Sequence, residues 1–118
     1  MSTNTAITPG RYADLTYGDV NIRSLGNRNT VGNTNGVRVN FCRACLQVQV
    51  ASIGTDVQVA LMGSLDGVNY FNIGATQTIA TNGFFGFIYP DVPVPFLAAR
   101  LVAINGGTPT VTFTLATS

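Results

Sequence analysis

Hydrophobic and polar residues alternate most regularly between residues 55 and 65. One side of this stretch carries Val57, Val59, Leu61, Gly63 and Leu65, and the other side carries Asp56, Gln58, Ala60, Met62 and Ser64. A period of two over about ten residues is typical of a half-buried β-strand. Asp66-Gly67 then predicts a turn, because glycine adopts positive φ without steric cost, and residues 70–73 predict a returning strand. The stretch therefore predicts a hairpin whose apolar face needs a second layer to cover it.

Shorter strands are predicted on both sides of this hairpin. They cover residues 20–23, 37–41, 46–51, 76–80, 84–89, 97–105 and 110–117. We expect residues 24–36, rich in Gly and Asn, to form a loop that ends in a tight turn at Asn35-Gly36. Residues 91–95 predict an extended connection outside the sheet, because proline cannot donate to a ladder. Eight or nine strands at intervals of about 8–12 residues predict a single all-β domain over residues 20–118, an antiparallel, jelly-roll-like β-sandwich.

Two of the predicted strands are apolar on both faces. In the strand at 84–89, Phe85 and Phe87 share one face with Tyr89, while Phe84 and Ile88 lie on the other. The strand at 97–105 has the same character, with Arg100 as its single charge. Such strands are predicted to be central in a sheet, or to be edges covered by a partner.

The first 19 residues are polar and unpatterned. Pro9-Gly10 breaks the segment, and Tyr12, Leu15 and Tyr17 are isolated apolar residues. A segment of this kind cannot bury enough surface to fold alone. Residues 1–19 therefore predict an extended N-terminal arm that stays ordered only where something holds it, for example a neighbouring subunit.

Charge is scarce along the 118 residues. Charged residues make up 9% of the chain, against about 25% in an average soluble domain. All cations are Arg and all anions are Asp. This favours a surface that is largely occupied by neighbours, although a neutral surface of Thr, Asn, Ser and Gln would also stay soluble. The net charge of +1 gives no reason to expect nucleic acid or an anionic membrane as a partner.

The two cysteines, Cys42 and Cys45, are not expected to bond to each other. Their odd spacing puts them on opposite faces of an extended strand. A zinc site would need ligands that the chain lacks, and a redox CxxC belongs to a βαβ setting. We expect two reduced thiols in a reducing cytoplasm. The start of the sequence has no signal-peptide pattern, and the longest apolar run, residues 96–104, is too short to span a bilayer, so neither usual secretion nor membrane insertion is expected.

The residue types do not favour catalysis. General acid–base chemistry at neutral pH usually needs His or a tuned Glu or Lys, and the chain contains none of these. A cysteine without His lacks the usual base. We therefore expect no enzyme activity, no cofactor and no small-molecule substrate. Asp66 and Asn69 offer oxygen atoms, but calcium takes about six to eight, so a structural turn is expected there rather than a metal site.

A resemblance gives the strongest indication of function. The run GSLDGVNYFNI, residues 63–73, resembles the GSLDGxxWxxL hairpin of many small all-β proteins encoded by tailed bacteriophages, with Tyr70 at the usual Trp position. The run PVPFLAARLVAINGGTPTVTFTLA is similar to the way such domains end. The resemblance covers about residues 48–116, whereas the first 36 residues match no pattern of this kind.

This resemblance implies a virion structural protein, made in the host cytoplasm. Among such proteins, a short chain without shaft repeats is most similar to a capsid decoration or cement protein, a homotrimer on the capsid surface that locks major capsid proteins together. Strands 84–89 and 97–105 would make the self-contacts, and residues 1–36 would reach the shell. The candidate partner-binding residues are Arg11, Tyr12, Tyr17, Arg23, Arg28, Phe84, Phe85 and Phe87. Two alternatives stay open: a carbohydrate- or receptor-binding sandwich module, and a tail, baseplate or fibre subunit.

Overall fold

The computed structural model describes residues 20–40 and 42–118, and all the regular elements within them are β-strands. These are β1 (Asn21–Arg28), β2 (Gly32–Asn33), β3 (Val37–Arg38), β4 (Cys42–Ser64), β5 (Phe71–Ile79), β6 (Gly83–Val92) and β7 (Phe96–Thr117). Every pairing between them is antiparallel, and they form one hydrogen-bonded sheet. The predicted all-β antiparallel class is therefore confirmed. The predicted arm, residues 1–19, lies outside the described residues.

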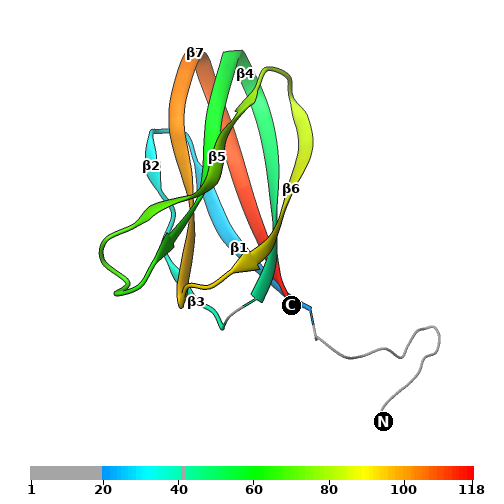
Figure 1. The fold of residues 1–118 in the computed structure, drawn as a ribbon. Coiled ribbons are helices and arrows are strands. Elements are labelled where there is room, and N and C mark those ends of the chain that lie inside the picture. The colour runs from blue at the N-terminus through cyan, green and yellow to red at the C-terminus, as the bar shows by residue number, and fades with distance from the viewer. Residues whose placement is uncertain (1–19, 41) are drawn as a thin grey trace, which may run out of the picture.

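Two long strands, β4 and β7, form the centre of the sheet. They pair almost from end to end, from Ala44 opposite Thr117 to Ser64 opposite Phe96. Midway, the register shifts around Ile53, and the ribbon formed by the two strands folds over, as seen at the top of Figure 1. On β4, Ser52 takes a left-handed conformation with φ of 58°, the one non-glycine residue of the described chain that does so. This fold in the ribbon turns one sheet into two layers.

Each half of the ribbon carries its own flanking strands. In the first layer, residues 44–50 of β4 and residues 111–117 of β7 lie between β1 and β6. In the second layer, residues 57–64 of β4 and residues 96–101 of β7 lie between β5 on one side and the short β2 and β3 on the other. The two layers face each other as a β-sandwich (Figure 1).

The core lies between these layers and comes from the alternating residues of both. Its fully buried side chains include Leu46, Val48, Val57, Val59, Leu61, Leu97, Leu101, Val111, Phe113 and Leu115. A second, smaller cluster lies on the outer side of the second layer, where Tyr70 and Val102 pack against Ala60, Met62 and Ala98. The chain's own loop thus covers part of the second apolar face that the sequence assigns to residues 97–105.

The strand count differs from the predicted eight or nine, because neighbouring segments join. Residues 46–51 and 55–65 belong to one strand, and so do residues 97–105 and 110–117. The intervening glycines form irregularities inside a continuous ladder rather than turns that end it. Leu65 lies just past the end of β4 and is exposed, although the alternation predicts it to share the buried face.

The prediction of one loop over residues 24–36, ending in a tight turn, is also wrong in part. β1 continues to Arg28, and residues 32–33 form β2. Gly36 does not have the positive φ of a tight hairpin turn, because β2 and β3 both pair with β7 rather than with each other. Gly36 is instead a place of close approach, since a Cβ there would overlap the Tyr70 hydroxyl.

Strand β6 extends further than expected, through Pro90 and Asp91 to Val92. Proline is tolerated there because β6 pairs on one side only, with β4, and the register shifts between Cys42 and Ala44 opposite it. The predicted connection outside the sheet is thus limited to residues 93–95.

The two cysteines lie on opposite faces of β4, as predicted, and both are free. Cys42 packs into the core, and burial raises the pKa of its thiol. Cys45 is half-buried on the outer side of the first layer.

Candidate functional site

The outer face of the first layer exposes large apolar side chains. β6 is an edge strand, and Phe84 and Ile88 on its outer side are 67% and 78% exposed. Phe85 and Phe87 point the other way and pack against the core. Of the three candidate phenylalanines, Phe84 is therefore the one that the described structure leaves largely exposed, while Phe85 and Phe87 are half-buried.

The strand register aligns apolar residues across this face. Ile88 lies opposite Cys45, Cys45 opposite Ala116, and Ala116 opposite Ile22. We call these four residues the apolar row. It runs from one edge of the first layer to the other, and both of its end residues are exposed.

A shallow pocket of about 240 Å³ lies along this row. It is lined by Val20, Arg43, Ala44, Cys45, Ile88, Ala116, Thr117 and Ser118. Arg43 is exposed and is the one charged side chain in the lining, while its backbone exchanges two hydrogen bonds of 3.0 Å with Ser118. The pocket can therefore accept an apolar group that carries an acidic neighbour.

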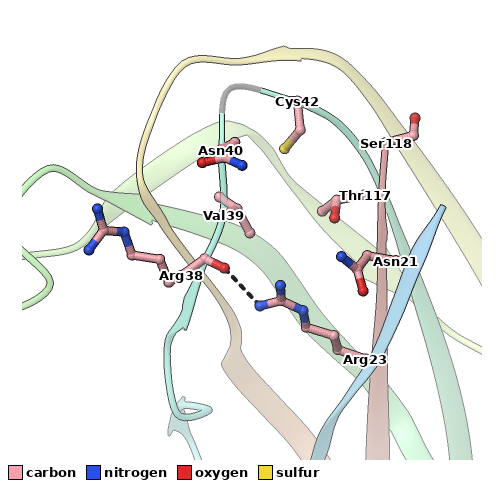
Figure 2. Close-up of a pocket in the computed structure, with 8 residues that line it drawn as sticks. All are labelled: Asn21, Arg23, Arg38, Val39, Asn40, Cys42, Thr117 and Ser118. Atoms are coloured by element: carbon pink, nitrogen blue, oxygen red, sulfur yellow. Dashed lines mark hydrogen bonds between the residues drawn. The ribbon is translucent and has the colours of Figure 1, made fainter. Parts of the chain in front are cut away.

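A second, more polar pocket of about 340 Å³ opens between the layers at the same end of the molecule (Figure 2). Its lining is Asn21, Arg23, Arg38, Val39, Asn40, Cys42, Thr117 and Ser118. The Arg23 Nη1 donates a hydrogen bond of 2.8 Å to the Arg38 carbonyl oxygen, and the Arg38 guanidinium lies 5.4 Å from the centre of the Phe96 ring. Arg43 lines the neighbouring pocket, so three arginines lie at this end of the molecule, which suits acidic or carbonyl groups of a protein partner. We call this region the basic end.

Arg28, another candidate anchor, is engaged inside the chain. Its guanidinium donates hydrogen bonds to the carbonyl oxygens of Thr30, Asn33 and Val31 at 3.1, 2.8 and 3.4 Å, and to the Thr30 hydroxyl at 3.3 Å. These bonds organise the turn between β1 and β2. Whether Arg28 also contacts a partner stays a prediction.

The tip of the β4–β5 hairpin is the third exposed feature. The Asp66 Oδ1 accepts hydrogen bonds of 2.8 Å from the Val68 and Asn69 amides, and the Ser64 hydroxyl donates to it at 2.9 Å. The amides of Asn69 and Val68, then the Asn69 and Ser64 side chains, hold the pKa of the Asp66 carboxyl far below its usual value. This rigid turn presents Leu65 and Val68, which are 69% and 78% exposed.

The candidate residues do not form one site. Arg23 and Arg28 lie on β1 and Phe84 on β6, which are opposite edges of the first layer. Arg11, Tyr12 and Tyr17 lie outside the described residues. The apolar row escaped the sequence reasoning, because its members come from four strands whose order the sequence does not reveal. The nearest signal in the sequence is Ile88, which the alternation places on the same face as Phe84.

No metal centre is apparent: residues 20–40 and 42–118 contain no group of three or more Asp, Glu, His or Cys side chains placed to hold an ion. A membrane-crossing helix is likewise not found in this part of the chain.

Comparisons with known proteins identify a related fold but no family. No protein-family model and no curated protein matches the chain. Among solved structures, the crystal structure of the SPBc2 prophage-derived protein YomS is similar, with a TM-score of 0.57 over 91% of this chain and 100% of that one. The two sequences are 13% identical, so the likeness is one of fold.

Proposed function

We propose that this protein is a non-enzymatic structural protein of a tailed-phage virion, and specifically a capsid decoration protein that binds and stabilises the shell of major capsid protein. The observation that carries the proposal is the exposed apolar outer face of the first layer, on a chain with 9% charged residues. Large apolar residues exposed together mark surfaces that meet other proteins. The fold likeness to a prophage-derived protein and the GSLDG hairpin support a phage origin.

The edge strand β6 is the proposed self-contact. Its outer backbone edge is unpaired in the described chain, and Phe84 projects beside it. An edge of this kind is a ready surface for another protein to cover. If one copy's β6 contacts a different surface of the next copy, the contact is heterologous and can close into a ring. A homotrimer on the capsid surface is the assembly we favour.

The basic end is the proposed contact with the shell. Arg23, Arg38 and Arg43 lie close to the start of β1, to which residues 1–19 are connected in the sequence. An oligomer that binds a repeating lattice through several weak contacts gains affinity, because the first contact keeps the remaining binding surfaces close to their own sites on the lattice. The proposed partners are thus a capsid protein and further copies of this chain, and not nucleic acid, a membrane or a small molecule.

The test is co-sedimentation of the full chain with bare capsid shells, together with its mass in solution by light scattering. We expect saturable binding and a trimer. Phe84→Ser should weaken the trimer, whereas Phe71→Ser, a matched change of an exposed phenylalanine on β5, should leave it intact. If the chain stays monomeric, does not co-sediment with shells and binds glycans, the result would support the carbohydrate-binding alternative. Binding to isolated tails instead of shells would support the tail or baseplate alternative.

A further inference from the structure

The pocket along the apolar row lies beside the point where the N-terminal arm joins the sandwich. Val20, the first described residue, is itself part of its lining and is exposed. The start of β1 and the end of β7 are paired, Asn21 with Thr117, so β1 begins one residue pair away from Ala116, which lies opposite Cys45. Any segment just before Val20 is thus tethered within a few residues of an apolar surface.

We propose that residues 15–19 of the same chain dock along the apolar row and fill this pocket. The distance fits the segment. From β1 to β6 there are three strand spacings, or about 14 Å, and five extended residues span about 16 Å. The segment can therefore cross from Val20 to Ile88 without a long loop.

The chemistry of the segment also fits the pocket. Leu15 and Tyr17 are two residues apart, so in an extended chain both face the same way and can cover Cys45 and Ile88. Asp19 shares their face in an extended segment and directly precedes Val20 in the sequence, so it would be held close to the pocket whose lining includes Arg43. An apolar strip with one acid thus meets an apolar pocket with one guanidinium.

The tether favours the chain's own arm over the arm of another copy. A short linker raises the effective concentration of the segment at the pocket to about the millimolar range, well above that of a dilute second subunit. Docking would leave residues 1–14 to extend beyond the module, and would confine the proposed β6 self-contact to the Phe84 end of that strand. This inference concerns the isolated chain and does not rest on shell attachment.

Cys45 provides a direct reporter, since it lines the pocket and Cys42 is buried in the core. In the full chain carrying Cys42→Ala, we would measure the rate at which iodoacetamide alkylates Cys45. If the docked state is populated to about nine-tenths, Leu15→Ser with Tyr17→Ser should raise this rate about tenfold. Thr16→Ser, which alters the other face of the segment, should leave the rate unchanged. Circular dichroism would verify that each variant is folded.

Equal alkylation rates in the parent and the double variant would overturn the proposal. A second measurement identifies the occupant: Tyr17→Cys in the same background should form a disulfide with Cys45 inside one chain under mild oxidation. A disulfide-linked dimer instead would assign the pocket to a second copy. Cys45 that becomes protected only after capsid shells are added would assign it to a capsid protein. Either outcome would overturn docking of the chain's own arm.

Discussion

Gly54 and Gly107 touch where the β4–β7 ribbon folds over: a Cβ on Gly107 would lie 2.8 Å from both the Cα and the amide nitrogen of Gly54. Gly107 also has a positive φ of 69°, which side chains rarely adopt. The fold in the ribbon thus depends on two backbones that approach with no side chain between them. Both layers of the sandwich depend on this contact, because it joins them.

Gly107→Ala should therefore destabilise the protein strongly. Left-handed strain and overpacking together predict a loss of about 2–4 kcal/mol in the free energy of unfolding. Urea denaturation followed by circular dichroism would measure it. Gly26→Ala is the matched control, since Gly26 has a φ of 86° but open space around its Cα. Only the conformational cost, about 1 kcal/mol, is expected there. Equal losses at the two positions would contradict the proposed role of the close approach.

Asp66→Ala should destabilise the β4–β5 hairpin in a way that depends on pH. The folded pKa of Asp66 is lowered from its ordinary value of 3.8, mainly by the amides of Asn69 and Val68. Its contribution is therefore fully present above about pH 4, and is lost as the pH falls toward the folded pKa. The difference in stability between wild type and variant should narrow between pH 4 and pH 2, as thermal unfolding would measure. Asp91→Ala, at an exposed carboxylate near the end of β6, is the control. A difference in stability that stays constant between pH 4 and pH 2 would contradict the stabilisation of the turn by the ionised Asp66 carboxylate.

Tyr89→Phe should leave the stability of the fold nearly unchanged at neutral pH, and should reduce the loss of stability at high pH. The Tyr89 hydroxyl is buried without a hydrogen-bond partner among the described residues, so its removal leaves no other group unpaired. Burial, and then the nearby Cys45 thiolate, raise the pKa of Tyr89 above its ordinary value of 10.0. The folded state resists ionisation, so wild type should lose stability as the pH rises above 10 and through the folded pKa. The variant should lose less over this range. Parallel stability curves by urea denaturation would contradict this expectation.

Arg28→Lys should loosen the turn between β1 and β2 while leaving the core intact. A lysine keeps the charge but cannot reproduce the fork of donors that reaches three carbonyl oxygens. We expect a loss of about 1 kcal/mol in stability. Hydrogen exchange should become faster at the amides of residues 30–33 and stay unchanged in β4. Uniformly faster exchange would indicate a global effect instead.

The sequence predicts the β-class and most strand positions, because alternation depends only on which residues face the core. It predicts the opposite faces of Phe84 and Phe85 for the same reason. It does not predict that residues 46–51 and 55–65 form one strand. Glycine is favoured both where a continuous pair of strands bends and where a turn ends a strand, so Gly54 does not distinguish the two. Nor does the sequence predict the role of Gly36, where a distant tyrosine, and not turn geometry, requires the missing side chain.

The candidate sites were harder to predict than the fold. The sequence predicts Arg23 and Arg28 as polar anchors for acidic or carbonyl groups of a partner, and this stays a prediction. It does not predict that both also donate to carbonyl oxygens of the chain's own backbone, which come close only on folding. The apolar row required the strand order β1-β7-β4-β6, in which sequence neighbours are not spatial neighbours. Pattern reasoning along one chain therefore finds exposed residues singly and does not group them.

The pairing of Asn21 with Thr117 has a mechanical consequence. Both ends of the sandwich emerge from the same rung of an antiparallel ladder, so a pull between them would open the β1–β7 hydrogen bonds one after another, as in a zipper. A load carried through the N-terminal arm alone does not act on that ladder in this way. Cargo fused after Ser118 and held under tension would act on it, so the module would yield readily when it is stretched between its two ends.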